Sequence, residues 1–573
     1  MTPANSFPTQ NPVIVQSDHT LLVEVDIPLY PRARDALGRF AELVKSPEHI
    51  HTYRLTPLSI WNACALGETA QTIASILRSL AKYPVPHHIE ASVRDFAGRY
   101  GALRLTRDGN DLLLRARDLP LAEELARREP LRGFLRERAG PLEFTVPLAE
   151  RGRLKHALIK LGFPTEDLAG YLAGEPFGFE VALRPQTLAG LPFAPRPYQR
   201  AAVDLFHAGG AARGGSGVVV LPCGAGKTIV GAMCMTTLQA STLILATNVT
   251  AARQWQQELV DKTTLPADAI GQYNGDSKDI RPVTIATYQI LTHRTTRESE
   301  FTHFKLFDER DWGLIIYDEV HLLPAPVFQV TAALQARRRL GLTATLVRED
   351  GRADEVFALI GPKKYDVPWK EMEHQGWIAK AVCTEIRLPM STARRMDYAL
   401  AAPRHQFRVA SENPEKLRIV RALLERHRGD SVLVIGNYLD QIDGFARELD
   451  LPLLKGSTAQ RERDEVYERF RNGEIKRLVV SKIANFSVDL PDAAVAIQVS
   501  GMFGSRQEEA QRLGRILRPK RGENQAHFYS IVSRDTVEQE FAMNRQLFLC
   551  EQGYEYRIVT LERADAALPE EAG

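Results

Sequence analysis

The chain contains few cysteines and no long apolar run. Its 573 residues include only five cysteines, at positions 64, 223, 234, 383 and 550, and no two of them form a C-x-x-C pair. This scatter argues against a structural zinc, an iron–sulfur cluster or a disulfide framework, and it fits a reducing cytoplasm. No run of 18 apolar residues occurs, and the N-terminal MTPANSFPTQNP has neither a basic residue nor an apolar core. We therefore expect no membrane span and no signal peptide.

A strong excess of one charge is also absent. The 73 lysines and arginines are balanced by 71 acidic residues, which gives a net charge of +2. This balance neither supports nor excludes a nucleic-acid partner, because a local basic groove can be offset by acidic residues elsewhere. With 44% hydrophobic and 25% charged residues, the composition is that of a soluble globular chain of roughly three to four domains.

A glycine-rich segment, LPCGAGKTIV (221–230), matches the phosphate-loop pattern G-x-x-x-x-G-K-[ST] except at its first position, which is Leu221. The apolar run GVVVL precedes it and a helical pattern follows it, and this context disfavours a chance match. The glycines accept positive φ and let the backbone wrap around a phosphate, the lysine reaches the β- and γ-phosphates, and the threonine hydroxyl binds Mg²⁺. The residues expected to hold the nucleotide are Gly224, Ala225, Gly226, Lys227 and Thr228.

The second motif is acidic: DEVH (318–321) follows the apolar run LIIY. We expect it on a strand that neighbours the phosphate-loop strand, at the sheet edge where open α/β sheets bind ligands. Asp318 would hold Mg²⁺ and Glu319 would orient or deprotonate the water that attacks the γ-phosphate. A solvated acidic loop is the alternative. His321 is assigned to coupling, although a histidine after a strand is often a plain loop residue.

The order of motifs predicts three blocks. Residues 1–185 mix strands and helices and form an α+β module. Residues 186–370 and 371–573 each alternate short apolar strands with helices, which predicts an α/β fold of two tandem RecA-like parallel-sheet domains. The proline-rich stretch 182–197 is interpreted as a linker that few contacts cross, so a fragment that starts near Leu191 should fold.

A third motif, QEEAQRLGRILRPK (507–520), lies in the last block. Gln511, Arg512, Arg515 and Arg518 follow a helical spacing, so the arginines share a broad face. An arginine that reaches across a closed cleft stabilises the charge on a transferring phosphoryl group. The alternative is a solvated basic helix.

Together these segments resemble a superfamily 2 helicase of the XPB type. The matching segments are APRPYQ, VLPCGAGKT, IIYDEVHLLPAPVF, LGLTATLVRED, LIGPKKYDVPW, SKIANFSVDLP and GSRQEEAQRLGRILRPK. They cover residues 190–560, and SPEHIHTYRLTPLSIWNA (46–63) resembles the N-terminal region of the same family.

The resemblance implies further roles. Arg196 and Gln199 would contact adenine, through paired hydrogen bonds from the amide, and Asp489 would lie near the ribose or metal, although IANFS replaces the glycine-acidic pair of many relatives. The residues implied in coupling are Thr343, Thr345, Arg348, Glu349 and Asp350. Thr247 and Thr287 would bind DNA phosphates or else cap helices. The segment at about 385–412, with Tyr398 and Phe407 among basic residues, would be a thumb that grips DNA, or else a solvated helix pair.

The resemblance implies an ATP- and Mg²⁺-dependent 3′-to-5′ DNA helicase or translocase, with a role in DNA repair. The expected partners are single-stranded and forked DNA, with a nuclease or other repair protein as a further candidate, and the expected state is a monomer. Three alternatives stay open: an RNA helicase, a duplex translocase that does not separate strands, and a nucleotide-gated DNA clamp or damage sensor.

Overall fold

The computed structural model describes residues 10–45, 49–222, 224–293, 303–307, 309–334, 337–344, 353–367, 372–373, 375–481, 493–501, 525–551, 554–563 and 568. The chain clusters into two compact units. The first comprises Met1–Glu42, His49–Leu221 and Gly226–Val367, and the second comprises Leu43–Glu48, Pro222–Ala225 and Pro368–Gly573. Across the described ranges, no helix is long and apolar enough to cross a membrane.

The N-terminal part of the chain contains two small sheets. The first has the strand order β1-β2-β4-β3, formed by Val13–Val15, Thr20–Glu24, Ile50–Arg54 and Glu42–Lys45. The second has the order β7-β8-β6-β5-β9, formed by Arg138–Gly140, Glu143–Pro147, Asp111–Ala116, Leu103–Asp108 and Thr165–Asp167. The helices among them are α1 (Tyr30–Leu37), α2 (Pro57–Ala65), α3 (Ala70–Leu80), α4 (His87–Arg99), α5 (Leu119–Arg127) and α6 (Arg151–Lys160). This is the mixed α and β module that the sequence predicts.

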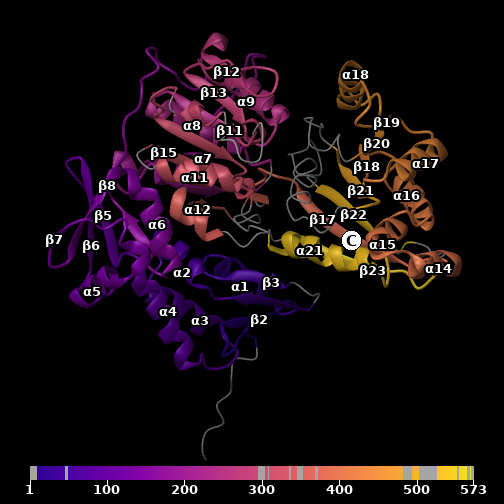
Figure 1. Ribbon diagram of the computed structural model, residues 1–573. Helices are drawn as coiled ribbons and strands as arrows, with labels where there is room; N and C mark the ends of the chain where they lie inside the picture. The colour runs from indigo at the N-terminus through magenta and orange to yellow at the C-terminus, as the bar shows by residue number, and fades with distance from the viewer. Residues whose placement is uncertain are drawn as a thin grey trace, which may run out of the picture. The chain divides into compact units, whose positions relative to one another are not determined.

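The first unit also holds a seven-stranded parallel sheet. Its order is β12-β13-β11-β14-β15-β10-β16, formed by Ile270–Tyr273, Val283–Thr287, Thr242–Ala246, Leu314–Asp318, Arg338–Thr343, Ser216–Val220 and Lys363–Asp366. The helices that accompany it are α7 (Pro197–His207), α8 (Lys227–Leu238), α9 (Val249–Lys262), α10 (Tyr288–Leu291), α11 (Ala325–Ala333) and α12 (Ala353–Leu359) (Figure 1).

Alternation along the strands assigns these helices to two faces. Ile315 and Tyr317 belong to the apolar cluster that includes residues of α11 and α12. Ile316, between them, faces α8, because a Cβ built on Gly231 would lie 3.3 Å from its Cδ1 atom. A sheet covered on both faces explains why its strands are continuous apolar runs.

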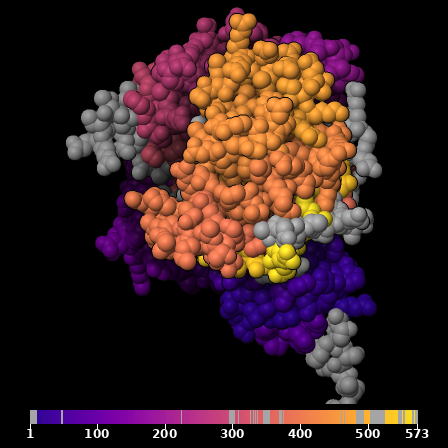
Figure 2. All heavy atoms as spheres, turned by 90° about the vertical axis from the view of Figure 1, so that its right-hand side faces the viewer, coloured from indigo at the N-terminus to yellow at the C-terminus, as the bar shows by residue number. Residues whose placement is uncertain are grey.

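The second unit contains another seven-stranded parallel sheet, with the order β19-β20-β18-β21-β22-β17-β23. Its strands are Leu453–Leu454, Arg477–Ser481, Val432–Gly436, Val495–Gln498, Gln525–Ser533, Lys380–Leu388 and Glu555–Thr560. Its helices are α14 (Thr392–Leu400), α15 (Pro403–Ser411), α16 (Glu415–Arg426), α17 (Leu439–Leu449), α18 (Gln460–Arg471) and α21 (Val537–Glu551). Figure 2 shows one face of this unit, largely formed by the orange segments before residue 481. The predicted α/β fold with two tandem parallel sheets is confirmed.

The proline-rich segment 182–197 is not a free linker. The backbone N–H of Arg184 donates to the carbonyl of Lys262, and that of Leu188 donates to Oδ1 of Asp261. The ammonium group of Lys262 also lies 5.9 Å from the centre of the Phe193 ring. The expectation that few contacts cross this segment is therefore wrong, because the segment is hydrogen-bonded along the C-terminal end of α9.

Candidate nucleotide-binding site

The predicted phosphate loop joins β10 to α8. Gly224 has φ of 78° and Gly226 has φ of 77°, so both occupy the left-handed region that favours glycine. Gly226 is the N-cap of α8, and the helix starts at Lys227. The loop therefore directs a helix N-terminus, with its partial positive charge, toward the position expected for phosphate.

Gln199, the residue expected to contact adenine, lies against this loop. Its Nε2 atom donates to the carbonyl oxygen of Gly226 over 3.4 Å, and its Oε1 atom accepts from the backbone N–H of Arg196 over 2.9 Å. A Cβ on Gly226 would lie only 2.6 Å from that Nε2 atom. Gln199 is buried, at 3% exposure. Its amide thus connects the start of α7 to the phosphate loop.

The DEVH segment lies two strands away from the phosphate loop. Strand β15 pairs with both β10 and β14, so it separates them. The expectation of neighbouring strands is wrong, because the strand that carries Thr343 inserts between the two motifs. The insertion adds to the site: the backbone N–H of Leu221 donates to the carbonyl of Thr343 over 3.0 Å.

Lys227 and Glu319 meet across this strand. The Nζ atom of Lys227 lies 3.1 Å from Oε1 of Glu319. Glu319 follows the end of β14 with φ of 48° and ψ of 56°, an uncommon left-handed conformation for a residue with a side chain. Although burial raises the pKa of Glu319, the charge of Lys227 and a hydrogen bond from the backbone of Ala344 lower it below its ordinary value. Glu319 is therefore held as a carboxylate beside the loop.

Asp318 is in a different electrostatic environment. Burial and the neighbouring charge of Glu319 raise its pKa to about 6. Two donors hold its carboxylate: the indole Nε1–H of Trp255 donates to Oδ2 over 2.9 Å, and the backbone N–H of Glu319 donates to Oδ1 over 3.1 Å. The hydroxyl of Tyr288 donates to the backbone carbonyl of Asp318 over 2.9 Å.

His321 is a buried member of the same group. Its Nδ1 atom lies 2.6 Å from Oγ1 of Thr343 and 3.5 Å from Oε2 of Glu319. At 6% exposure it is not the plain loop residue that was the alternative. The contact joins the DEVH segment to the end of β15, and the role of His321 in coupling stays a prediction.

The donor set fits a magnesium-bound nucleoside triphosphate. Asp318 and the half-buried Thr228 supply oxygen atoms, which are the ligands that Mg²⁺ prefers. Lys227 supplies a cation, and Gly224 and Gly226 carry no Cβ at their two positions in the loop.

The two threonines expected at DNA lie at the ends of neighbouring strands, since Thr287 ends β13 and Thr247 directly follows β11. Thr287 pairs in register with Ala246, the residue before Thr247. Asn248, and not Thr247, caps α9, since its Oδ1 atom accepts from the N–H of Ala251. Thr287 occupies the N-cap position of α10 without a side-chain capping bond and is 2% exposed, so its side chain is less accessible than that of the half-buried Thr247.

The thumb-like segment is a helix pair, α14 and α15, whose aromatic residues have structural contacts. Phe407 is buried and meets the ring of Phe541 edge-on at 5.2 Å, and the hydroxyl of Tyr398 accepts from the N–H of Val537. For Phe407 the expectation of a place on a DNA-binding surface is wrong, because the helical period turns it inward with Ala410. The role of the half-buried Tyr398 stays a prediction. The exposed surface of the pair carries Arg395 and Arg404.

The remaining predicted site residues lie outside the described residues. They are Thr345, Arg348, Glu349, Asp350, Asp489, Gln511, Arg515 and Arg518. Their roles stay predictions.

Sequence reasoning missed Trp255 and Tyr288. Both are apolar-looking helix residues whose contacts with Asp318 arise only from the fold. The one available signal was position, since Tyr288 directly follows Thr287 and Trp255 lies two turns after Thr247.

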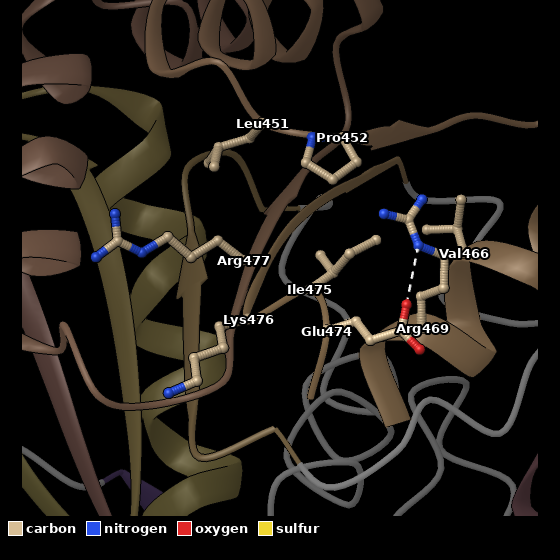
Figure 3. Close-up of a pocket in the computed structure, with 8 residues that line it drawn as sticks. All are labelled: Leu451, Pro452, Val466, Arg469, Glu474, Ile475, Lys476 and Arg477. Atoms are coloured by element: carbon tan, nitrogen blue, oxygen red, sulfur yellow. Dashed lines mark ion pairs between the residues drawn. The ribbon is translucent and has the colours of Figure 1, made fainter. Parts of the chain in front are cut away.

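A separate pocket of about 380 Å³ lies in the second unit (Figure 3). Its lining combines apolar residues with an ion pair of 3.5 Å between Arg469 and Glu474. None of its lining residues was predicted as a site residue. They are Leu451, Pro452, Val466, Arg469, Glu474, Ile475, Lys476 and Arg477.

The phosphate loop, the DEVH segment and the two tandem parallel sheets fit the superfamily 2 helicases that the sequence resembles. The family model described as "ERCC3/RAD25/XPB C-terminal helicase" matches residues 372–570, "Type III restriction enzyme, res subunit" matches residues 192–348, and "Helicase conserved C-terminal domain" matches residues 13–139. Two bacterial proteins, both named "DNA 3'-5' helicase XPB", are each 53% identical. The protein from Kineococcus radiotolerans aligns over 99% of both chains, and that from Mycobacterium tuberculosis over 96% of this chain and 98% of its own.

A eukaryotic relative is more distant. The "General transcription and DNA repair factor IIH helicase/translocase subunit XPB" of Antonospora locustae is 34% identical over 96% of this chain and 82% of its own. This chain belongs to the XPB family of DNA helicases.

Proposed function

We propose that this chain is an ATP-driven DNA helicase or translocase that moves 3′ to 5′ and acts in DNA repair. The observation that carries the proposal is the grouping of Lys227, Asp318 and Glu319 at one sheet edge. It occurs in a chain that is 53% identical, over 99% of its length, to a protein named DNA 3'-5' helicase XPB.

Each side chain at this edge has a role in hydrolysis. Lys227 binds the β- and γ-phosphates, and this contact releases Glu319 from the ion pair that it forms with the ammonium group. Glu319 then orients or deprotonates the attacking water. Thr228 and Asp318 would hold Mg²⁺, which would supply positive charge to the phosphates. Gln199, with Arg196, contacts adenine.

The second block completes the reaction. Arg515 and Arg518, with Gln511, stabilise the charge on the transferring phosphoryl group, and Asp489 contacts the ribose or the metal. Thr343 and Thr345 link hydrolysis to strand movement. Arg348, Glu349 and Asp350 act where the strands separate.

The working environment follows from this activity. DNA is the macromolecular substrate, as a single strand or a fork, and the enzyme acts as a monomer in the cytoplasm. A nuclease or another repair protein is the expected protein partner.

The test is the rate of ATP hydrolysis at fixed salt with no nucleic acid, single-stranded DNA, duplex, forked DNA and RNA. Salt is fixed because binding to phosphates depends steeply on it. The proposal requires stimulation by DNA over RNA and separation of a fork with a 3′ tail. Stimulation without strand separation identifies a duplex translocase, and DNA binding without hydrolysis identifies a clamp.

The first prediction isolates the phosphate loop. Lys227→Ala should remove most ATP hydrolysis, by about a hundredfold or more, since it deletes the cation that binds the phosphates. DNA affinity, measured by fluorescence anisotropy, should remain close to that of the native protein. Hydrolysis near the native rate would contradict the assignment.

A further inference from the structure

Three neighbouring strands bring the predicted DNA contacts next to Asp318. The order β13-β11-β14 places the ends of these strands side by side at one edge of the sheet. Ala246 of β11 pairs with Thr287 of β13, and Leu245 of β11 pairs with Tyr317 of β14. Asp318, one residue after Tyr317, therefore lies level with Ala246 and Thr287. With adjacent strands about 4.8 Å apart, Thr287 and Asp318 are separated by about two strand spacings.

Strands β11 and β13, which carry the predicted DNA contacts at their ends, each lead into a helix that contacts Asp318. Helix α9 begins at Val249, directly after Thr247 and its cap Asn248, and its Trp255 donates to the carboxylate of Asp318. Helix α10 begins at Tyr288, directly after Thr287, and the hydroxyl of Tyr288 donates to the backbone carbonyl of Asp318. Two separate segments therefore meet at one aspartate.

Both aromatic rings are confined by their surroundings. Trp255 is 2% exposed and Tyr288 is 5% exposed. Gly231 on α8 makes room for the indole, because a Cβ at this position would lie 2.5 Å from the Cη2 atom of Trp255. A buried side chain in a close-packed interior transmits a displacement of its helix to its partner.

We propose that Trp255 and Tyr288 are positioning residues that couple DNA binding to the orientation of Asp318. This inference deepens the proposed function and rests on it. A phosphate that binds near Thr247 or Thr287 shifts the start of α9 or α10. The shift moves Trp255 or Tyr288, each of which donates a hydrogen bond to Asp318. Asp318 is the aspartate expected to hold the metal that accompanies the nucleotide. Because coupling is reciprocal, the nucleotide changes DNA affinity by the same factor.

The test compares Tyr288→Phe and Trp255→Phe with the native full-length chain. Each substitution removes one donor and keeps an aromatic ring. We expect the DNA affinity ratio, measured with and without a non-hydrolysable ATP analogue and Mg²⁺, to fall about fivefold or more toward one. The stimulation of ATP hydrolysis by single-stranded DNA should fall by a similar factor. Gly231→Ala, which displaces the indole without removing its N–H, should reproduce the effect of Trp255→Phe.

Two buried aromatic residues in the same unit provide matched controls. The Nε1–H of Trp312 donates to the carbonyl of Leu306, and the hydroxyl of Tyr273 bonds to Nδ1 of His303, so neither group bonds to Asp318. Trp312→Phe and Tyr273→Phe should keep the native affinity ratio and the native DNA stimulation. Thermal melting shows whether each variant is folded. In the event that Trp255→Phe is unfolded, Tyr288→Phe, which removes a single oxygen atom, provides the test of the inference.

Fluorescence supplies a readout that is independent of hydrolysis. The DNA-induced change in tryptophan emission should be lost in Trp255→Phe and kept in Trp312→Phe. Native affinity ratios and native DNA stimulation in both Tyr288→Phe and Trp255→Phe would overturn the inference and leave the proposed function intact. A native chain that DNA does not stimulate would instead refute the proposed function.

Discussion

At the scale of single residues, the site depends on the different treatment of two adjacent carboxylates. Asp318 has a raised pKa and two hydrogen-bond donors, whereas the pKa of Glu319 is lowered by the nearby ammonium of Lys227. The left-handed backbone at Glu319 turns its side chain toward the phosphate loop, while Asp318 still belongs to strand β14. Adjacent positions in a regular strand would point to opposite faces. The turn is therefore what allows both to serve one site.

Glu319→Gln should separate nucleotide binding from hydrolysis. The amide keeps the shape of the side chain but cannot take a proton from water, so the rate should fall by about 10² to 10⁴. ATP affinity, measured by calorimetry, should be retained because the phosphate loop is unchanged. Failure of this variant to bind ATP would assign Glu319 a role in the loop itself.

His51 should make the stability of the N-terminal module sensitive to acid. It is 5% exposed, and burial followed by the charge of Arg34 lowers its pKa to about 4. Between about pH 6.5 and 4 the unfolded chain binds the proton more readily, so stability falls as the pH drops through this window. The loss is at most about 3 kcal/mol.

Denaturant melts at pH 7 and pH 5 would measure this effect. His51→Gln should reduce the difference between the two pH values, and His49→Gln, at a neighbouring exposed histidine, should leave it unchanged. Equal pH dependence in the native chain and His51→Gln would show that another group is responsible.

At the scale of elements, the apolar runs correctly predicted which residues form strands, but they did not predict the order of the strands in the sheet. GVVV, TLILA, VTIAT and LIIY all form buried strands, because a sheet covered on both faces requires continuous apolar residues. The position of β15 between β10 and β14 depends on long-range pairing, which no local pattern contains. For the same reason the sequence predicted Lys227, Asp318 and Glu319 but not Trp255 or Tyr288, whose roles come from contacts across the fold.

The helix pair α14–α15 illustrates how composition misleads. Basic residues with aromatic residues between them suggested a DNA-binding surface, but Phe407 packs into the core. Phe407→Ala should therefore lower the free energy of unfolding of the second unit by about 3–5 kcal/mol. Arg404→Ala, at an exposed position on the same helix, should change stability by no more than about 0.5 kcal/mol.

Chemical denaturation of both variants, with DNA affinity measured in parallel, would test this prediction. A Phe407→Ala variant of native stability with weakened DNA binding would contradict this prediction and would show that the Phe407 ring contacts DNA.

At the scale of the whole molecule, the N-terminal module and the first parallel sheet share one core. Trp61 of α2 and Ile159 of α6 belong to the same apolar cluster as Phe357 of α12. The backbone N–H of Lys363 on β16 donates to Oδ1 of Asn62 over 3.1 Å. Such an arrangement is typical of one cooperative unit, and not of a module joined by a flexible linker.

Polar groups extend this shared core. Arg339, fully buried at the start of β15, lies with its guanidinium 5.4 Å from the centre of the Tyr171 ring, and Arg151 of α6 lies 5.0 Å from the same ring. Arg151 is held in turn by Asp167 of β9, through a contact of 2.7 Å. Because β15 ends at Thr343, the strand that reaches the nucleotide site starts at the N-terminal module.

A fragment that begins at Leu191 should consequently fail to fold on its own, although it contains every residue assigned to hydrolysis. Removing residues 1–190 exposes the side of Phe357 that Trp61 covers and leaves Arg339 without the Tyr171 ring. Burial of apolar surface is the main favourable term in folding, so the exposed core should make the fragment aggregate. Co-expression of residues 1–190 with residues 191–573 should restore a soluble complex, because the two pieces rebuild the same core. Size-exclusion chromatography and ATP hydrolysis of the fragment, the co-expressed pair and the full chain measure the effect. A soluble, monomeric fragment with the hydrolysis rate of the full chain would show that the N-terminal module is a separable recognition domain and that the shared core contributes little to stability.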